Sequence, residues 1–279
     1  MTESLIPRPE YPRPQFVRDR WVNLNGPWTM AFDFGKSGTD KDYASCAGFE
    51  NEILVPFCPE SKLSGVGYTD FIEDMWYQRV LEIPEDWNGS RIHLNFGGVD
   101  YACEIFIDGV SMGRHWGGTV AFTIDISAAV IPGHQHNLVV HVQDEVRSGR
   151  QPGGKQCPDL KSRGCHYTRT TGIWQTVWME AVPVQGIANV CVIPDVDGQR
   201  FIVTPTYSSI NSGQRLRVSL LDRGTLLGTA EAAAANGVPV IVHVVDPRLW
   251  SPEHPFLYDL NFEVLDENGS VIDRVSSYA

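Results

Sequence analysis

The feature that most constrains the fold of this chain is a set of short runs in which every second residue is apolar. In one run Ile92, Leu94 and Phe96 alternate with polar residues, and the same period recurs over residues 122–126, 138–142, 216–220 and 258–264. Turn-forming pairs separate the runs, at Asn25-Gly26, Asn88-Gly89, Asp108-Gly109, Asp197-Gly198, Asn236-Gly237 and Asn268-Gly269. A period of two residues is that of a half-buried strand, and such pairs accept positive φ in tight hairpins. Because no long amphipathic helical pattern is present, the chain is predicted to be all-β.

The length of 279 residues favours two domains, with one large β domain as the alternative. We place the boundary near Pro183, where shorter strands at a regular spacing begin. Residues 1–183 are predicted to form a jelly-roll β-sandwich, and residues 184–279 have the size of an immunoglobulin-like β-sandwich. The sequence stops at Ala279 within strand-like residues, an ending that suggests a truncation.

Charge and composition argue against several classes of partner. The net charge is −12 with 22 basic residues and no Lys/Arg stripe, so neither nucleic acid nor a membrane surface is expected to bind. No apolar run is long enough to cross a bilayer, and residues 1–20 are polar and contain four prolines, so a cytoplasmic location is predicted.

The six cysteines are scattered singly, and Cys103 and Cys191 are predicted to be small core residues.

Three sequence patterns contain residue types that could form a catalytic or metal site. Gly109–Gly113 matches the nucleophile-elbow pattern of serine hydrolases, but Asp108-Gly109 indicates a hairpin and no helix can follow, so a nucleophile is not expected at Ser111. Two loose clusters contain metal-ligating residue types, namely His134, His136, His141 and Asp144, and Cys157, Cys165 and His166. Their spacing does not enforce convergence on one ion, so structural roles are favoured and no metal or cofactor is predicted. Acidic residues adjacent in sequence do not define the opposed pair that glycoside cleavage needs, so no catalytic residue is assigned.

The most distinctive stretch is residues 149–180, which is rich in Gly, Arg, Lys and aromatic residues. A long polar loop on a rigid β scaffold is a common place for binding residues. The residues predicted to hydrogen-bond sugar hydroxyls are Lys155, Gln156, His166, Tyr167 and Arg169. Tyr167 or Trp174 would offer an apolar face. Packing of this loop against a neighbouring domain is the alternative, and the two roles are compatible.

Several motifs resemble glycoside hydrolase family 2. They are Trp21-Val22-Asn23-Leu24-Asn25-Gly26-Pro27-Trp28, Phe96-Gly97-Gly98-Val99-Asp100-Tyr101-Ala102, Ile107-Asp108-Gly109, Gly113-Arg114-His115-Trp116-Gly117-Gly118, and Thr171-Gly172-Ile173-Trp174-Gln175-Thr176-Val177-Trp178. In the second segment, residues 249–258 (LWSPEHPFLY) resemble the signature of the family's immunoglobulin-like domain. The motifs run in the family's order and cover nearly the whole chain.

The resemblance implies the sugar-binding, galactose-binding-like jelly roll and the immunoglobulin-like domain of a retaining β-glycosidase. In that family both catalytic glutamates lie on a (β/α)₈ barrel that follows these domains, so this chain would be a non-catalytic scaffold and active-site rim, inactive alone. Its partners would be a β-glycoside substrate and the C-terminal barrel of the same protein. Family members that act on galactosides or glucuronides carry an active-site aspartate six residues before the glycine matching Gly172, and His166 occupies that position here. This departure leaves the sugar and linkage open.

Two further interpretations belong to other classes of protein. A free-standing carbohydrate-binding module would bind oligosaccharides without a barrel, whereas a purely structural pair of sandwiches would bind none. The oligomeric state is also open, with a homo-oligomer among the alternatives.

Overall fold

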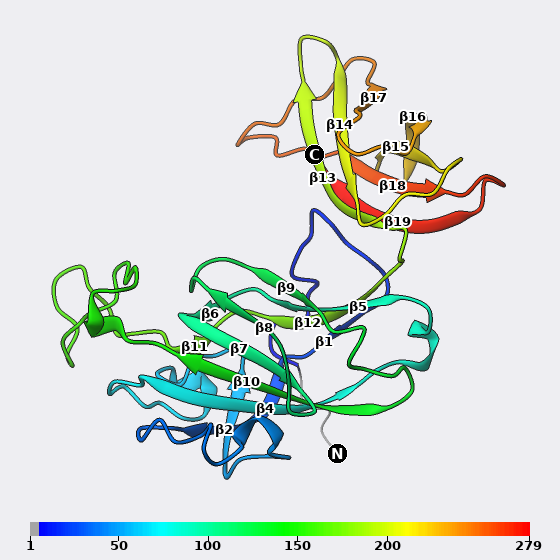
Figure 1. Cartoon of the computed structure of the whole chain (residues 1–279). Helices are drawn as coiled ribbons and strands as arrows, with labels where there is room; N and C mark the ends of the chain where they lie inside the picture. Colours follow the sequence, from blue (N-terminus) through cyan, green and yellow to red (C-terminus); the bar gives the residue numbers. More distant parts are fainter. Residues whose placement is uncertain (1–5) are drawn as a thin grey trace, which may run out of the picture. The chain divides into compact units, whose positions relative to one another are not determined.

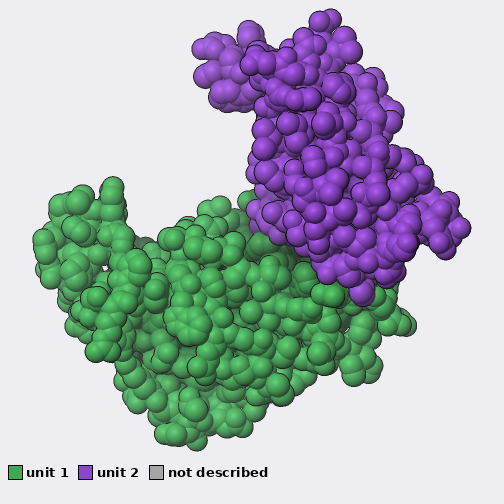
Figure 2. Space-filling model, turned by 45° about the horizontal axis from the view of Figure 1, so that its top comes forward, with its two compact units in different colours: residues 1–10, 21–181 green, residues 11–20, 182–279 purple. Residues whose placement is uncertain are grey.

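The computed structural model describes residues 6–279, and these form two compact units (Figures 1 and 2). Unit 1 comprises residues 6–10 and 21–181, and unit 2 comprises residues 11–20 and 182–279. Within the described residues the helical segments are short 3-10 turns: η1 (Tyr43–Ser45), η2 (Lys62–Ser64), η3 (Glu85–Trp87) and η4 (Val146–Ser148). All other regular structure is β, as predicted.

Unit 1 is a jelly-roll sandwich of two main antiparallel sheets, which confirms the prediction (Figure 1). The larger sheet has the order β3 (Asn51–Val55), β2 (Gly26–Phe32), β4 (Asp74–Glu82), β10 (Gln135–Gln143), β7 (Ala102–Ile107), β8 (Val110–Trp116). The smaller sheet has the order β1 (Trp21–Asn23), β12 (Val177–Val182), β5 (Arg91–Phe96), β9 (Phe122–Asp125). A two-stranded ladder joins β6 (Val99–Asp100) to β11 (Gly172–Ile173).

The core of unit 1 lies between its two main sheets and follows the predicted alternation. Ile92 and Leu94 of β5 and Leu138 and Val140 of β10 are buried in one apolar cluster. In the strands of the larger sheet, the residues between these buried positions face away from this core. Since successive side chains point to opposite faces of a strand, this second set lines the outer face of the sheet.

Unit 2 has the two-sheet arrangement of an immunoglobulin-like sandwich (Figure 1). One sheet contains β13 (Ile187–Asp195), β14 (Arg200–Tyr207) and β17 (Val240–His243), and the other has the order β16 (Thr225–Ala233), β15 (Arg215–Asp222), β18 (Asp259–Leu265), β19 (Val271–Tyr278). The predicted alternation again fills the core, with Leu216, Val218, Leu260 and Phe262 buried.

Residues 11–20 pack with unit 2, although the predicted division places them in the first domain. Val17 forms a β-bridge with Ser276 of β19. The buried guanidinium of Arg18 forms an ion pair with the buried carboxylate of Asp273 and donates to the carbonyl oxygen of Ile187 at 2.5 Å. Nothing in the local pattern of residues 11–20 indicates a strand, because their partners lie more than 160 residues away in the chain. The division into domains 1–183 and 184–279 stays a prediction.

The cysteine and membrane predictions can also be compared with the structure. Cys103 is buried in the core of unit 1 as predicted, but Cys191 is exposed on β13, so that prediction is wrong. Alternation alone does not say which face of an outer strand is covered. In residues 6–279 no helix has the length and hydropathy needed to span a membrane.

Candidate functional site

The predicted binding loop runs from Gly149, after η4, to Thr171, before β11, and projects from unit 1 (Figure 1). Its internal pairing is sparse: a parallel bridge joins Gln156 to Tyr167, and an antiparallel bridge joins Arg163 to His166. The loop must therefore be held mainly by side-chain contacts with the sandwich below it.

Arg169 is the main anchor of the loop. Its side chain is buried, and the guanidinium lies 4.2 Å from the ring centre of Phe71. Nη1 donates to the carbonyl oxygens of Cys157 at 3.2 Å and Asp159 at 2.7 Å, and Nη2 donates to that of Thr69. Because these donors are engaged with backbone, Arg169 holds the loop in position, and a sugar contact by Arg169 stays a prediction.

Gln156 is the second anchor. Its Nε2 donates to Asp100 Oδ2 at 2.7 Å, and its Oε1 accepts from the backbone N–H of Thr170 at 2.9 Å. Both ends of the amide are thus engaged with protein. The Gln156 side chain is half-buried, and a sugar contact by it stays a prediction.

The other three predicted ligands lie at the loop surface. Lys155 is exposed, Tyr167 is 63% exposed, and the backbone N–H of Tyr167 donates to the carbonyl oxygen of Lys155 at 2.7 Å. His166 is half-buried, and its backbone N–H donates to Arg163 O at 3.0 Å. The structure therefore brings Lys155 and Tyr167 side by side with His166 adjacent in sequence, and a sugar contact by any of them stays a prediction.

Beneath the loop lies a group of buried carboxyls that the sequence did not reveal: Asp100, Asp144 and Glu60. Asp144 accepts from Gln151 Nε2 at 2.6 Å and from Thr171 Oγ1 at 3.0 Å. Glu60 accepts from the backbone N–H of Thr171 at 3.2 Å. Thr171 thus joins two of these carboxyls to the end of the loop.

Burial raises the pKa of Asp100 most, the charges of Asp144 and Glu60 raise it too, and the hydrogen bond from Gln156 lowers it, so that the pKa is about 7. Burial also raises the pKa values of Asp144 and Glu60. In the sequence Asp100 belongs to a family motif and Asp144 to a candidate metal cluster, but no local pattern brings the two together. Gly118 packs so closely on the Asp100 carboxyl that a Cβ there would lie 2.2 Å from Oδ1.

A cavity of about 410 Å³ opens beside this group. It is lined by Phe71, Ile72, Glu73, Asp144, Glu145, Val146, Arg147, Ser148, Arg169 and Thr171. Acidic, basic and hydroxyl groups around one aromatic ring suit a ligand rich in hydroxyls. Of the five predicted ligands only Arg169 lines this cavity.

The residues of the discarded catalytic and metal patterns make ordinary structural contacts. Asp108 (φ 49) and Gly109 (φ 81) form the tight turn between β7 and β8, and Ser111 Oγ donates to Glu104 Oε1 at 2.6 Å. His136 Nδ1 lies 2.7 Å from Asp108 Oδ2, and His141 Nε2 lies 2.8 Å from Asp74 Oδ1. Across residues 6–279 no group of three His, Cys, Asp or Glu residues is arranged to hold a metal ion.

Fold and sequence comparisons define the class of protein. The model of the sugar binding domain of glycosyl hydrolases family 2 matches residues 66–179, and the model "Glycosyl hydrolases family 2" matches residues 186–279. The chain therefore belongs to glycosyl hydrolase family 2, through its sugar-binding and immunoglobulin-like domains.

Individual relatives are longer proteins. A β-glucuronidase of Paenibacillus borealis is 26% identical over 215 residues, which cover 74% of this chain and 35% of that protein. A β-galactosidase of Thermoanaerobacter pseudethanolicus is 24% identical over 69% of this chain and 26% of its own length. The solved β-glucuronidase of Ruminococcus gnavus in complex with D-glucaro 1,5-lactone superposes with a TM-score of 0.75 at 21% identity, over 95% of this chain and 46% of that one. The chain thus spans about a third of the length of the first of these relatives.

Proposed function

We propose that this chain is the non-catalytic N-terminal portion of a retaining β-glycosidase and serves as scaffold and active-site rim for a C-terminal catalytic barrel. The observation that carries the proposal is the succession of the two family domains in a chain that spans only 26–35% of the two glycosidase relatives described above. On this proposal the parent protein hydrolyses O-glycosyl bonds in carbohydrate metabolism. A cytoplasmic location stays a prediction from the sequence.

The loop of residues 149–171 would form the rim. Its base is rigidly anchored by Arg169 and Gln156, while Lys155 and Tyr167 are exposed at its surface. Anchored backbone with exposed polar and aromatic side chains is the arrangement expected of a ligand-facing loop. The substrate would be a β-glycoside whose sugar remains to be identified by experiment.

Hydrolysis of a panel of nitrophenyl β-glycosides tests the proposal. The 279-residue chain is compared with the product of the same reading frame extended past Ala279. Cleavage by the longer protein alone is the expected result, and the panel then names the sugar. Cleavage by the shorter chain would overturn the requirement for a barrel, and cleavage by neither would overturn the glycosidase assignment.

The rim is tested separately in the longer protein. Tyr167→Ala and His166→Ala are expected to raise KM, with Lys161→Ala, an exposed change in the same loop, as the control. Kinetics equal to those of the unmodified protein in both variants would assign the loop to packing against a neighbouring domain instead.

A further inference from the structure

A polar groove lies on the outer face of the larger sheet of unit 1, and no residue of the loop 149–171 lines it. The register of the strands brings the groove residues together. Glu104 of β7 is paired with His141 of β10 on one side and with Arg114 of β8 on the other. In the next row Ala102 of β7 is paired with Trp116 of β8. These rows place their side chains on the face away from the core.

Part of this outer face is covered and part is open. The segment after β2 covers the part around Trp76, since the Tyr43 ring lies 5.7 Å from the Trp76 ring and the backbone N–H of Gly38 donates to Asp33 Oδ2 at 2.6 Å. Beyond this cover a groove of about 240 Å³ remains. It is lined by Thr39, Ala102, Cys103, Glu104, Arg114, Trp116, His141 and Gln143.

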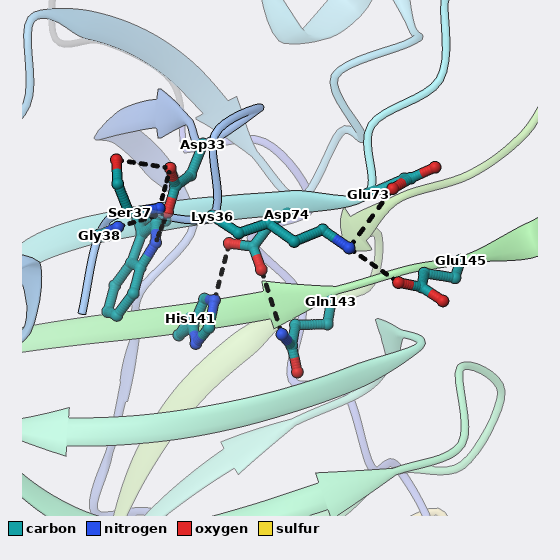
Figure 3. A network of polar contacts seen from close by, with 10 residues as sticks. Asp33, Lys36, Ser37, Gly38, Glu73, Asp74, His141, Gln143 and Glu145 are labelled. Carbon is teal, nitrogen blue, oxygen red and sulfur yellow. Dashed lines mark hydrogen bonds and ion pairs between the residues drawn. The ribbon is translucent and has the colours of Figure 1, made fainter. Parts of the chain in front are cut away.

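The polar groups of the groove are held in place by buried partners. The buried carboxylate of Asp74 lies 2.8 Å from His141 Nε2 and accepts from Gln143 Nε2 at 3.1 Å (Figure 3). The His141 ring also stacks on Trp76, with ring centres 3.9 Å apart and planes 8° from parallel. This bracing fixes the rotamers of both groove residues before a ligand arrives, which lowers the entropic cost of binding.

Trp116 supplies an apolar surface at the side of the groove. It ends edge strand β8 and is 61% exposed. A large aromatic ring left in solvent beside ordered donors and acceptors is the combination that a pyranose ring requires, because its C–H face packs on an aromatic ring while its hydroxyls need planar polar side chains.

The charges of the groove favour a neutral sugar. Arg114 Nη2 lies 2.9 Å from Glu104 Oε2, so the guanidinium is already balanced by a carboxylate, and Asp74 adds a further acidic group. An anionic ligand would meet no uncompensated positive charge here, and the chain as a whole carries −12.

We propose that this groove is a sugar-binding site for a neutral pyranose unit of an oligosaccharide, with Trp116 as the stacking platform and Glu104, Arg114, His141 and Gln143 as the hydrogen-bonding residues. The site is separate from the loop of residues 149–171, and the proposal does not depend on the presence of a catalytic barrel.

Isothermal titration of the 279-residue chain with neutral cello-, xylo-, manno- and galacto-oligosaccharides tests the proposal, with glucuronic acid as the anionic comparison. At least one neutral oligosaccharide is expected to bind. Trp116→Ala should weaken that binding at least tenfold, whereas Trp116→Phe, which keeps an aromatic face, should weaken it less. Trp250→Ala is the matched control, because Trp250 is similarly exposed (58%) but lies in unit 2 beside Leu249 and Pro247.

Three outcomes would overturn the proposal. They are the absence of binding to every neutral sugar, binding that Trp116→Ala leaves unchanged, and stronger binding of glucuronic acid than of the neutral sugars. If Tyr167→Ala abolishes sugar binding and Trp116→Ala leaves it unchanged, the sugar binds at the loop, and the proposal is overturned. Near-ultraviolet circular dichroism of each variant confirms that the sandwich is folded.

Discussion

The loop of residues 149–171 and the groove on the outer sheet face hold polar side chains in place by different means. In the loop, Arg169 and Gln156 reach carbonyl and carboxyl oxygens on other segments, including Thr69 and Asp100. In the groove, the ladder β10–β7–β8 sets the spacing of the side chains. The comparison teaches that loop geometry depends on a few buried polar contacts, whereas groove geometry follows from strand register. Substitutions of comparable size should therefore have large effects in the loop anchors and small ones in the groove.

The largest loss of stability is expected from a substitution at Gly172, where the loop returns to the sheet. Its φ is +74°, and a Cβ there would lie 2.2 Å from the hydroxyl of buried Tyr77. Gly172→Ala should lower the free energy of unfolding by about 3 kcal/mol, measured by urea denaturation. Gly153→Ala is the control within the loop, because a Cβ at Gly153 meets no atom within 4 Å. Equal midpoints for the two variants would contradict the close packing at Gly172.

Removal of the Arg169 guanidinium, the main anchor of the loop, should cause the next largest loss of stability. Arg169→Met keeps an apolar stem over Phe71 but loses the hydrogen bonds to Cys157, Asp159 and Thr69. A loss of about 2 kcal/mol is expected, because one buried and two partly buried carbonyls lose their donor. Hydrogen exchange should speed up in residues 155–160 and not in β10.

The matched control is Arg163→Met, which removes an exposed pair with Asp159 from the same loop. Because this pair is exposed to solvent, the urea midpoint of the variant should equal that of the unmodified chain. Faster exchange throughout unit 1 in the Arg169 variant would show that the anchor supports the whole sandwich instead of the loop.

The pH dependence of stability tests the buried carboxyls beneath the loop. An unfolded aspartate titrates near pH 4, whereas burial raises the pKa of Asp100 to about 7 in the folded chain. The folded state thus holds this proton more tightly, so the contribution of Asp100 to stability is complete below about pH 4 and is lost as pH rises to about 7. Asp100→Asn should become more stable relative to the unmodified chain between pH 4.5 and 8, as urea midpoints would reveal.

Asp195→Asn is the control of opposite sign. Hydrogen bonds from Gly198 and Arg200 lower the pKa of Asp195, so its stabilising contribution is present above about pH 4 and lost as pH falls. That variant should lose stability at pH 7. Parallel pH profiles for Asp100→Asn and the unmodified chain would contradict the raised pKa of Asp100.

The smallest effect on stability is expected in the groove. Arg114→Ala removes the ion pair between the exposed Arg114 and the half-buried Glu104 and should change the free energy of unfolding by less than about 0.5 kcal/mol. It should nevertheless weaken binding of a neutral oligosaccharide severalfold in calorimetric titration. Arg274→Ala removes a comparable pair with Glu263 in unit 2 and should leave sugar binding unchanged. A large loss of stability in Arg114→Ala would contradict the view that strand register and the contacts of buried Asp74 and Trp76 maintain the groove.

The local pattern of the sequence determined much of the fold. Alternation over residues 92–96 and 138–142 predicted the strands and their buried faces, and Asp108-Gly109 predicted the hairpin, because side-chain period and turn geometry are properties of a few consecutive residues. The motifs around Gly172 and Trp250 were enough to indicate the family. The polar, Gly-rich composition likewise predicted a long loop within residues 149–180, and the structure ends that loop at Thr171.

Tertiary structure alone decided which polar side chains are accessible and which are buried. Arg169 is buried and Gln156 is half-buried because their partners, Thr69 and Asp100, come from distant segments. The raised pKa of Asp100 and the placement of residues 11–20 in unit 2 have the same origin. Trp116 belongs to a recognisable motif, but its exposure beside His141 and Glu104 follows from the order of three strands in the sheet. Desolvation and long-range pairing depend on segments far apart in the chain, and a local sequence pattern carries no information about them.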